Sequence, residues 1–171
     1  MNNLHHQIEK DKYKIRQLSE SEAQIYKSMR LEAINEEPAM FRCSVPAEAD
    51  LTDEQWQERI KFPRAIFCLF EHDKPIGMTS ILLINEEEAY LGQSYIKKDY
   101  RGLGLSALLY KIRMDWAYQQ QVKQLSISHR ESNSISKAAN QRYGFRYTHR
   151  ETVNWLDGNT EDALYYTLEL P

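Results

Sequence analysis

The sequence has few cysteines, and neither lies in a recognisable ligand pattern. Cys43 and Cys68 are the only two in 171 residues, which excludes a disulfide framework as the basis of the fold. Cys68 stands inside the apolar run of residues 65–70, as is typical of a reduced core residue. Neither cysteine has a neighbour at the usual zinc-ligand spacing, so we expect no metal.

The chain also lacks a long apolar segment and a strong net charge. No run approaches the roughly 18 apolar residues that cross a bilayer, and the formal net charge is −3. Such a chain has no electrostatic bias toward nucleic acid or an anionic membrane, and we expect it to bind neither. Residues 1–11 are polar and lack the apolar centre of a signal peptide. We therefore expect a cytoplasmic protein, with a loose tail at 1–11 and one domain at 12–171.

Hydrophobic periodicity, together with residues that start or end helices and strands, predicts the order of the secondary-structure elements. Capping boxes at Ser19–Glu22 and Thr52–Gln55 mark two helix starts. Strands are expected near residues 12–17, 64–71, 76–84, 89–96, 124–129, 146–155 and 162–170. Helices are expected near residues 19–35, 52–61, 105–119 and 132–142. A strand–helix–strand crossover inside such a series indicates an α/β (α+β) fold, with a mixed, mostly antiparallel sheet of about seven strands and about four flanking helices.

Two glycines one residue apart stand between a predicted strand and a predicted helix, in Arg101-Gly102-Leu103-Gly104-Leu105-Ser106. Glycines there leave backbone N–H groups uncovered at the positive end of the helix dipole, which favours a phosphate. No Lys-Ser/Thr follows, as in a P-loop, and no third glycine follows, as in a dinucleotide fingerprint. A phosphate site of another kind is therefore favoured. A further glycine, Gly92, interrupts the preceding strand and predicts a bulge or a close backbone approach.

The loop and its surroundings resemble the GNAT superfamily of acetyl-CoA-dependent N-acetyltransferases. The family's loop reads Arg/Gln-x-x-Gly-x-Gly/Ala, which residues 101–106 match with serine last. Ile96 and Tyr100 match a hydrophobic residue five before the arginine and an aromatic directly before it. Further on, three elements stand at the family's spacing: Asn133, Ser136 and Gly144-Phe145.

The resemblance covers about residues 12–170 and implies a GNAT fold with acetyl-CoA as co-substrate. It implies that loop N–H groups hold the CoA phosphates and that a backbone N–H near Ile96 polarises the thioester carbonyl. Arg101 itself is either part of this site or a surface cation. The cofactor-binding residues it implies are Ser94, Tyr95, Ile96, Arg101, Gly102, Leu103, Gly104, Leu105, Ser106, Asn133, Ser136 and Asn140.

One position departs from the family pattern. Asn140 stands where the family commonly has a tyrosine that protonates the leaving thiolate. Tyr143 lies three residues further on, within about one helical turn of the same face. It is the candidate general acid, with a core aromatic as the other interpretation. Thiols have a pKa near ~8.5, so this proton is the least demanding requirement of the reaction.

The attacking amine must lose a proton, because an ammonium is no nucleophile. His129 ends the strand beside which the family admits the acceptor, and its unperturbed pKa suits a base. A hydrogen-bonded, partly buried histidine is the other interpretation. Glu71 and the glutamates at 86–88 are candidates that act through water, although residues 86–88 also suit a solvated turn.

The sequence thus predicts direct transfer of an acetyl group from acetyl-CoA to a primary amine, with no cysteine placed for a covalent intermediate. The alternative, motivated by Asn140, is an acyl-CoA-binding module without chemistry. The acceptor is a small-molecule or peptide amine, and the protein is a monomer or homodimer. Acidic residues in the expected acceptor loop, residues 33–51, favour a cationic acceptor unless they are simply solvated.

Overall fold

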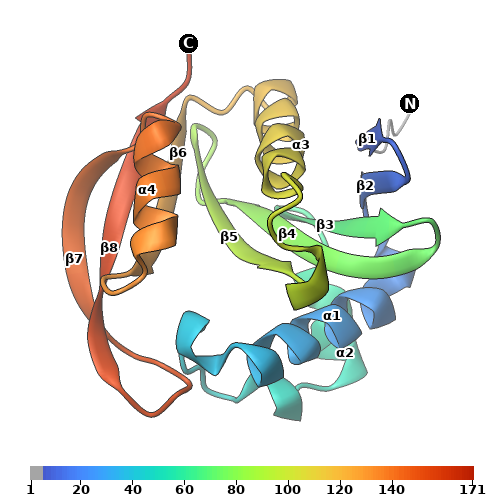
Figure 1. Ribbon diagram of the computed structural model, residues 1–171, viewed down its shortest axis with the longest axis horizontal. Helices are drawn as coiled ribbons and strands as arrows, with labels where there is room; N and C mark the ends of the chain where they lie inside the picture. Colours follow the sequence, from blue (N-terminus) through green and yellow to red (C-terminus); the bar gives the residue numbers. More distant parts are fainter. Residues whose placement is uncertain (1–5) are drawn as a thin grey trace.

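A computed structural model of the protein describes residues 6–171. Its sheet has eight strands in the order β1-β2-β3-β4-β5-β6-β8-β7 (Figure 1). The strands are β1 (Gln7–Lys10), β2 (Tyr13–Gln17), β3 (Arg64–Glu71), β4 (Lys74–Leu83), β5 (Glu88–Ile96), β6 (Gln124–Arg130), β7 (Arg146–Asn154) and β8 (Thr160–Glu169). Every neighbouring pair is antiparallel except β5 and β6, which are parallel. The mixed, mostly antiparallel sheet predicted from the sequence is confirmed, with one strand more than expected.

Four α-helices cover the sheet. They are α1 (Ala23–Glu36), α2 (Asp53–Arg59), α3 (Ser106–Gln119) and α4 (Ser134–Arg142). Figure 1 shows α1 and α2 on one face of β3–β5, α3 on the opposite face, and α4 alongside β6 and β8. Both predicted capping boxes are present: Ser19 N–H donates to Glu22 Oε1 at 2.9 Å, and Thr52 N–H donates to Gln55 Oε1 at 2.9 Å.

The additional strand lies in the segment predicted to be a loose tail. Residues 1–5 fall outside the described part of the chain, but Gln7–Lys10 form β1, which pairs antiparallel with β2. Ile8 is opposite Ile15 and packs against the core, and Asp11 makes the turn with a φ of 55°. The tail prediction is therefore wrong for residues 7–10. With one apolar side chain, β1 has too weak a periodic signal to be recognised before its partner is known.

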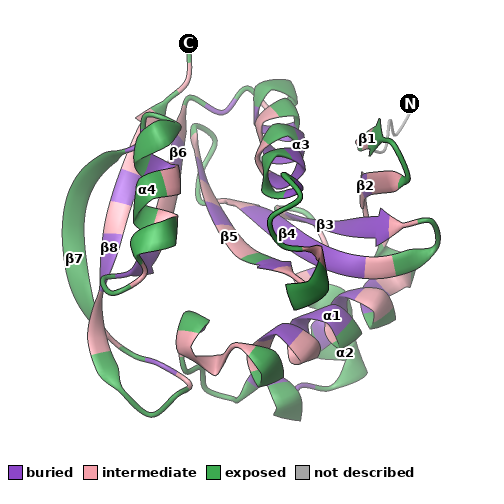
Figure 2. Ribbon diagram, viewed as in Figure 1, coloured by how far each residue is buried: buried purple, intermediate pink, exposed green. Residues whose placement is uncertain are grey.

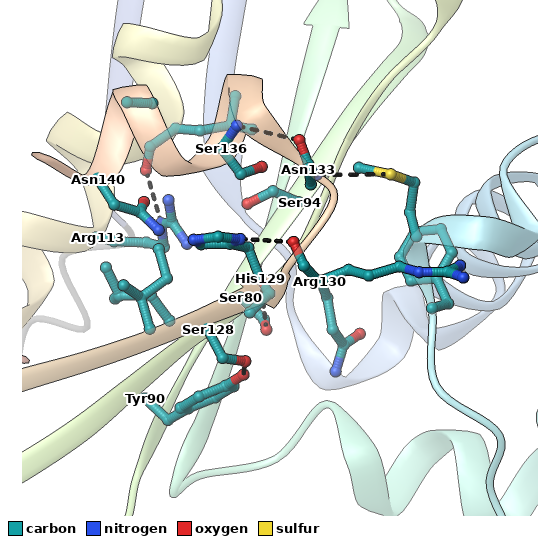
Figure 3. Close-up of a pocket in the computed structure, with 18 of the residues that line it drawn as sticks. Ser80, Tyr90, Ser94, Arg113, Ser128, His129, Arg130, Asn133, Ser136 and Asn140 are labelled. Carbon is teal, nitrogen blue, oxygen red and sulfur yellow. Dashed lines mark hydrogen bonds between the residues drawn. The ribbon is translucent and has the colours of Figure 1, made fainter. Parts of the chain in front are cut away.

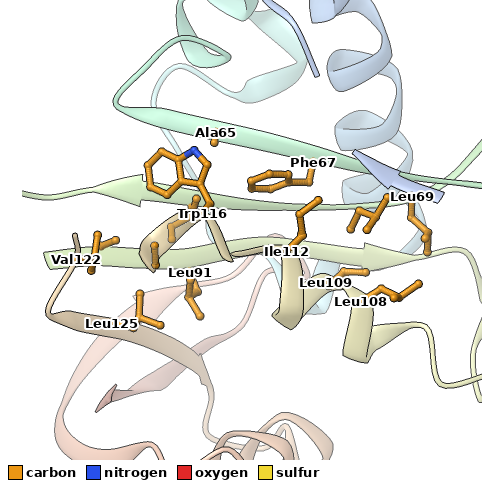
Figure 4. Packing of buried hydrophobic residues seen from close by; sticks show 14 of the residues in the cluster. Ala65, Phe67, Leu69, Leu91, Leu108, Leu109, Ile112, Trp116, Val122 and Leu125 are labelled. Carbon is orange, nitrogen blue, oxygen red and sulfur yellow. The ribbon is translucent and has the colours of Figure 1, made fainter. Parts of the chain in front are cut away.

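The core has two halves, one on each face of the sheet. On one face, α3 packs Leu108, Leu109, Ile112 and Trp116 onto the strands (Figure 4). On the other face, α1 and α2 cover a second buried cluster that includes Cys68. Figure 2 shows buried residues along the central strands and exposed residues along most of β7. Burial raises the pKa of the Cys68 thiol to about 12, as befits a reduced core residue. Within residues 6–171, no helix is long and apolar enough to cross a membrane.

Candidate functional site

The site begins where the two parallel strands separate. β5 and β6 pair only from Glu88 opposite Gln124 to Leu91 opposite Ile127. Just beyond Leu91, the register of β5 against β4 shifts, and Gln93 has a φ of 55°. A bulge bends its strand and interrupts pairing, so β5 turns away from β6. This is the irregularity that Gly92 predicted, and it opens a gap in the middle of the sheet.

The glycine loop follows β5 and leads into α3. Gly102 and Gly104 both have a φ of 77°, a left-handed conformation that favours glycine. A Cβ added at either glycine would meet nothing within 4 Å, so the loop surface is open to a ligand. No side chain caps the first turn of α3. The N–H groups at this helix end suit the phosphates that the sequence predicted.

A cavity of about 1140 Å³ adjoins both features. It passes through the gap and has a part on each face of the sheet. The α3 side is lined by residues of α3 and α4, including Ser106, Leu109, Tyr110, Arg113, Asn140 and Tyr143. The α1 side is lined by residues of the opposite face, including Arg30, Arg42, Glu48, Ser80, Tyr90, Ser128 and Tyr165. The cavity therefore reaches both faces of the sheet beside the gap between β5 and β6.

Half of the predicted cofactor residues line this cavity. They are Ser94, Gly104, Ser106, Asn133, Ser136 and Asn140. Asn133 also caps α4, since its Oδ1 accepts from the N–H of Ser136 at 3.1 Å. Figure 3 shows both residues above the strand that carries His129. The other predicted cofactor residues lie in the loop or at the end of β5 outside the cavity lining: Tyr95, Ile96, Arg101, Gly102, Leu103 and Leu105.

Arg101 has a structural role in this conformation. Its Nε donates to the carbonyl of Ile96 at 2.8 Å, and its Nη1 lies 2.8 Å from Glu37 Oε1. The side chain thus ties the end of β5 to the end of α1. Tyr95 faces α1 as well, and burial together with the charge of Glu32 raises its pKa to about 12. Both side chains are thus engaged with the α1 side in this conformation.

Asn140 is almost fully buried in the cavity wall. Its Oδ1 accepts a hydrogen bond of 3.0 Å from the hydroxyl of Tyr110, and its Nδ2 is buried without a partner in the described chain. Tyr143 stacks on Tyr110, with ring centroids 3.9 Å apart, and remains 44% exposed. The sequence did not single out Tyr110. The side chains of α3 and α4 place two tyrosine hydroxyls near the position that Asn140 occupies.

His129 is buried, and both of its ring nitrogens are engaged. Nδ1 lies 2.7 Å from the carbonyl of Arg130 (Figure 3), so it must donate. Nε2 lies 3.0 Å from the hydroxyl of Tyr166. When the ring is neutral, Nε2 is then the acceptor for the Tyr166 hydroxyl. This geometry favours the structural interpretation of His129 over a role as base.

The other candidate bases lie away from the cavity lining. Glu71 pairs with Lys12 at 3.0 Å and accepts from the Tyr100 hydroxyl at 3.1 Å. Glu87, in the turn before β5, pairs with Lys123 at 2.8 Å. Within the described residues, Glu48 is the one carboxylate that lines the cavity, and two arginines bind it.

Sequence analysis missed the polar group on the α1 side. Arg42 donates from Nη1 to the Tyr165 hydroxyl at 2.6 Å and from Nη2 to Ser128 Oγ at 2.9 Å. The Tyr90 hydroxyl lies 2.6 Å from the same Ser128 oxygen (Figure 3). Arg42 stands 86 residues from Ser128 and 123 from Tyr165 in the sequence. No local motif links residues so far apart.

Comparisons with known proteins agree with this arrangement. The model of the acetyltransferase (GNAT) family matches residues 29–145, and no curated protein has a significant sequence match.

The chain resembles many solved structures, among them the following three. A ribosomal-protein-S5-alanine acetyltransferase from Vibrio fischeri is 16% identical, with 95% and 96% of the two chains covered and a TM-score of 0.76. A putative acetyltransferase from Acinetobacter baylyi is 21% identical, with 92% and 93% covered and a TM-score of 0.75. RimL, a ribosomal L7/L12 α-N-protein acetyltransferase in complex with coenzyme A, is 17% identical, with 92% and 94% covered and a TM-score of 0.71. At these identities the likeness concerns the fold, whereas the family model matches more than half of the sequence. The chain therefore belongs to the GNAT family of acetyltransferases.

Proposed function

We propose that the protein transfers an acetyl group from acetyl-CoA directly to a primary amine. The observation that carries the proposal is the single cavity that reaches the glycine loop on one face and the polar α1 side on the other. A thioester donor and an amine acceptor that enter from opposite faces meet at the gap between β5 and β6. Bringing both into one complex supplies much of the rate acceleration, because the reaction becomes effectively intramolecular.

The donor is held by its phosphates in this proposal. The uncapped N–H groups at the start of α3 face the pyrophosphate, and the two glycines allow its close approach. The pantetheine arm runs into the gap, where β5 beyond Leu91 has no pairing with β6. A backbone N–H of this part of β5 polarises the thioester carbonyl as negative charge develops on its oxygen.

The acceptor nitrogen attacks the thioester carbon in its neutral form, and CoA leaves as a thiolate. Tyr143 is the proposed donor of a proton to that thiolate, since the hydroxyl of Tyr110 is engaged with Asn140. Two similar structures are named as enzymes that act on ribosomal proteins, so peptide α-amines belong in the first acceptor panel. Their pKa of about 7.7–8.0 leaves a sizeable neutral fraction at pH 8.

An amine panel with a thiol readout tests the proposal. Acetyl-CoA and the protein are mixed with peptide N-termini, polyamines, amino acids and amino sugars, and free CoA thiol is measured against enzyme-free controls. We expect turnover with at least one class of amine. Binding of acetyl-CoA with no turnover on any amine favours the alternative, an acyl-CoA-binding module, which the replacement of the usual tyrosine by Asn140 motivates.

A thermal-shift comparison of acetyl-CoA, ATP and NAD tests the cofactor separately. We expect acetyl-CoA to stabilise the protein by mass action. Stabilisation by ATP or NAD alone would contradict the cofactor assignment.

A further inference from the structure

The charges that line the cavity are unbalanced. Every basic residue in the lining, apart from His129, is an arginine, and Glu48 is the one carboxylate among the described lining residues. Arg113 and Arg142 belong to the α3 side, and Arg130, at the end of β6, is paired with Asp157 and Glu161. The other four are Arg30 of α1, Arg42 between α1 and α2, Arg59 of α2 and Arg64 at the start of β3. CoA phosphates at the glycine loop account for positive charge on the α3 side. They do not account for arginines on the opposite face of the sheet.

Arg42 is a guanidinium held in place without an ion pair in the described chain. Its hydrogen bonds go to two neutral oxygens, those of Tyr165 and Ser128. Glu151 is reached only through Tyr165, whose hydroxyl donates to it at 3.0 Å. The backbone is fixed too, because Cys43 N–H donates to the carbonyl of Asn154 at 2.9 Å and extends the pairing past β7. Arg42 is therefore preorganised. Its guanidinium lies over the rings of Trp155 and Tyr165, and no carboxylate of the described chain pairs with it.

Arg30 adds a second unsatisfied group. Its Nε and Nη2 bind both oxygens of Glu48, at 3.0 and 3.1 Å, and Arg59 binds the same carboxylate at 3.2 Å. Two guanidinium groups thus share one negative charge. The remaining Nη1 of Arg30 is buried and has no partner in the described chain. A buried charged donor without an acceptor is costly, and Arg30 belongs to the lining of the cavity.

Arg42 lies close to the gap in which the acetyl transfer is proposed to occur. Ser128, its hydrogen-bond partner, directly follows Ile127, the last residue of β6 that pairs with β5. Arg42 therefore lies at the edge of the gap, on the α1 side. A ligand whose carboxylate is bound to Arg42 would therefore have its amine next to the gap.

We propose that the amine acceptor carries a carboxylate close to its nitrogen, and that Arg42 binds that carboxylate. A guanidinium matches the planar carboxylate with two parallel N–H groups. The carboxylate is either the α-carboxylate of a free amino acid or an acidic side chain near a peptide N-terminus. The inference rests on the proposed function, and it reverses the cationic acceptor favoured by the acidic sequence of residues 33–51. In that segment Glu37 and Glu48 are both neutralised by arginine.

Product binding tests the carboxylate site without requiring turnover. Calorimetry on the full chain saturated with CoA compares N-acetylglycine with N-acetylglycinamide, and N-acetyl-Asp-Gly-amide with N-acetyl-Asn-Gly-amide. We expect one acid to bind at least about tenfold more tightly than its amide, and the pair that shows the difference identifies the source of the carboxylate. Equal binding within both pairs, or no binding by either acid, overturns the proposal.

Substitutions test whether Arg42 is responsible for the tighter binding of the acid. Arg42→Gln should reduce the ratio of the affinities for acid and amide at least about fivefold. Arg42→Lys keeps the charge but loses the two parallel N–H donors of the guanidinium, and it should reduce this ratio less. Arg146→Gln is the matched control, because Arg146 is exposed on β7 and its loss changes the net charge equally. An equal effect of the control and Arg42→Gln would show a net-charge effect and overturn the assignment. Melting curves establish that each variant is folded.

Acetyl-transfer kinetics separate this proposal from the proposed function. Turnover with equal kcat/KM for acid and amide acceptors refutes the carboxylate site and leaves the transferase. Tight binding of an acid through Arg42, with no acetyl transfer to any amine, refutes the transferase and leaves the carboxylate site.

Discussion

Tyr110 and Tyr143 stack face to face at the wall of the cavity, and Asn140 accepts a hydrogen bond from only one of them. A tyrosine at residue 140 would have carried its hydroxyl into the cavity from α4. Tyr110 of α3 and Tyr143, directly after α4, both line the cavity. Replacement of that tyrosine by Tyr143 is part of the proposed function.

Tyr143→Phe should lower kcat while retaining affinity for CoA. The phenyl ring keeps the stacking on Tyr110, but the proton donor to the thiolate is lost. General acids contribute about 10²-fold or more, and we expect a loss of about 10¹ to 10²-fold because a thiol is already a good leaving group. Steady-state kinetics measure it. Tyr147→Phe, which alters a half-exposed tyrosine on β7, is the control, and an unchanged kcat for Tyr143→Phe would remove Tyr143 from the mechanism.

Cys43→Ala should leave kcat within about twofold of the wild type. Cys43 is exposed and lines the cavity, so it is the thiol to be tested for a covalent intermediate. Direct transfer needs no such thiol and predicts intersecting lines in initial-velocity plots, whereas a covalent route gives ping-pong kinetics. Parallel lines in the wild type, together with loss of activity in Cys43→Ala, would refute direct transfer.

Among the elements, the loop between β5 and α3 shows how backbone geometry makes a binding surface. Gly104 has no crowding neighbour, and glycine is favoured there by its positive φ. The same openness exposes N–H groups that a side chain would cover. The proposed binding of the cofactor therefore depends on a loop whose two glycines contribute no side chain to the core.

Gly104→Asp should abolish measurable acetyl-CoA binding while the protein still folds. The side chain and its charge would lie against the phosphates, and Asp tolerates a left-handed φ better than most residues. Calorimetry with acetyl-CoA measures the loss. Gly104→Asn is the neutral control and should lose less affinity, and Gly158→Asp, at another open glycine with φ of 87°, reports the cost of the substitution to stability. Unchanged affinity in Gly104→Asp would refute the loop assignment.

At the junction of β2 and α1, Glu22 should make stability depend on pH. The hydrogen bonds from Arg16, at 2.8 Å to both carboxylate oxygens, lower the pKa of Glu22 from 4.5 to about 2. A lowered pKa in the folded state stabilises the protein above the unfolded pKa, and this contribution is lost as the pH falls from 4.5 toward 2. Urea unfolding at several pH values should give a steeper decline for the wild type than for Glu22→Gln. Glu54→Gln, at an exposed position of α2, should retain the steep decline, and parallel curves for all three proteins would contradict the prediction.

At the scale of the whole molecule, the sheet separates two hydrophobic clusters, one on each of its faces. One buried cluster lies under α3 and the other under α1 and α2, and the gap between β5 and β6 is the place where a cavity passes from one face to the other. In the proposed function, donor and acceptor reach this gap from opposite faces of the sheet.

Ile112→Ala should lower the free energy of unfolding by about 2–5 kcal/mol, the usual cost of removing a large buried aliphatic side chain. Ile112 is fully buried between α3 and the sheet (Figure 4). Urea unfolding measures it, and Ile135→Ala, at a side chain that is 83% exposed, should cost less than about 0.5 kcal/mol. Similar costs for the two variants would contradict the packing described for α3.

Much of the fold was predictable because its signals are local. The strand at Arg64–Glu71 was predicted with its observed bounds, and the helix after the glycine loop was read from its apolar period. β1 was missed because its stability comes from pairing with β2 rather than from its own sequence. The residues expected to bind the cofactor lie in two continuous segments, which is why local motifs could propose them, and their role stays a prediction.

The sequence by itself determined the order of the elements, the capped helix starts, the family and the glycine loop, all of which depend on residues a few positions apart. Only the tertiary structure decided that both nitrogens of His129 are engaged, that Tyr110 reaches Asn140, and that Arg42 meets Ser128 at the gap. The contacts to Tyr166, Asn140 and Ser128 join segments that are far apart in the sequence, and Arg42 meets Ser128 beside the gap that opens beyond Leu91. Hydrogen bonding and charge at such a site depend on distances in space, which no spacing along the chain encodes.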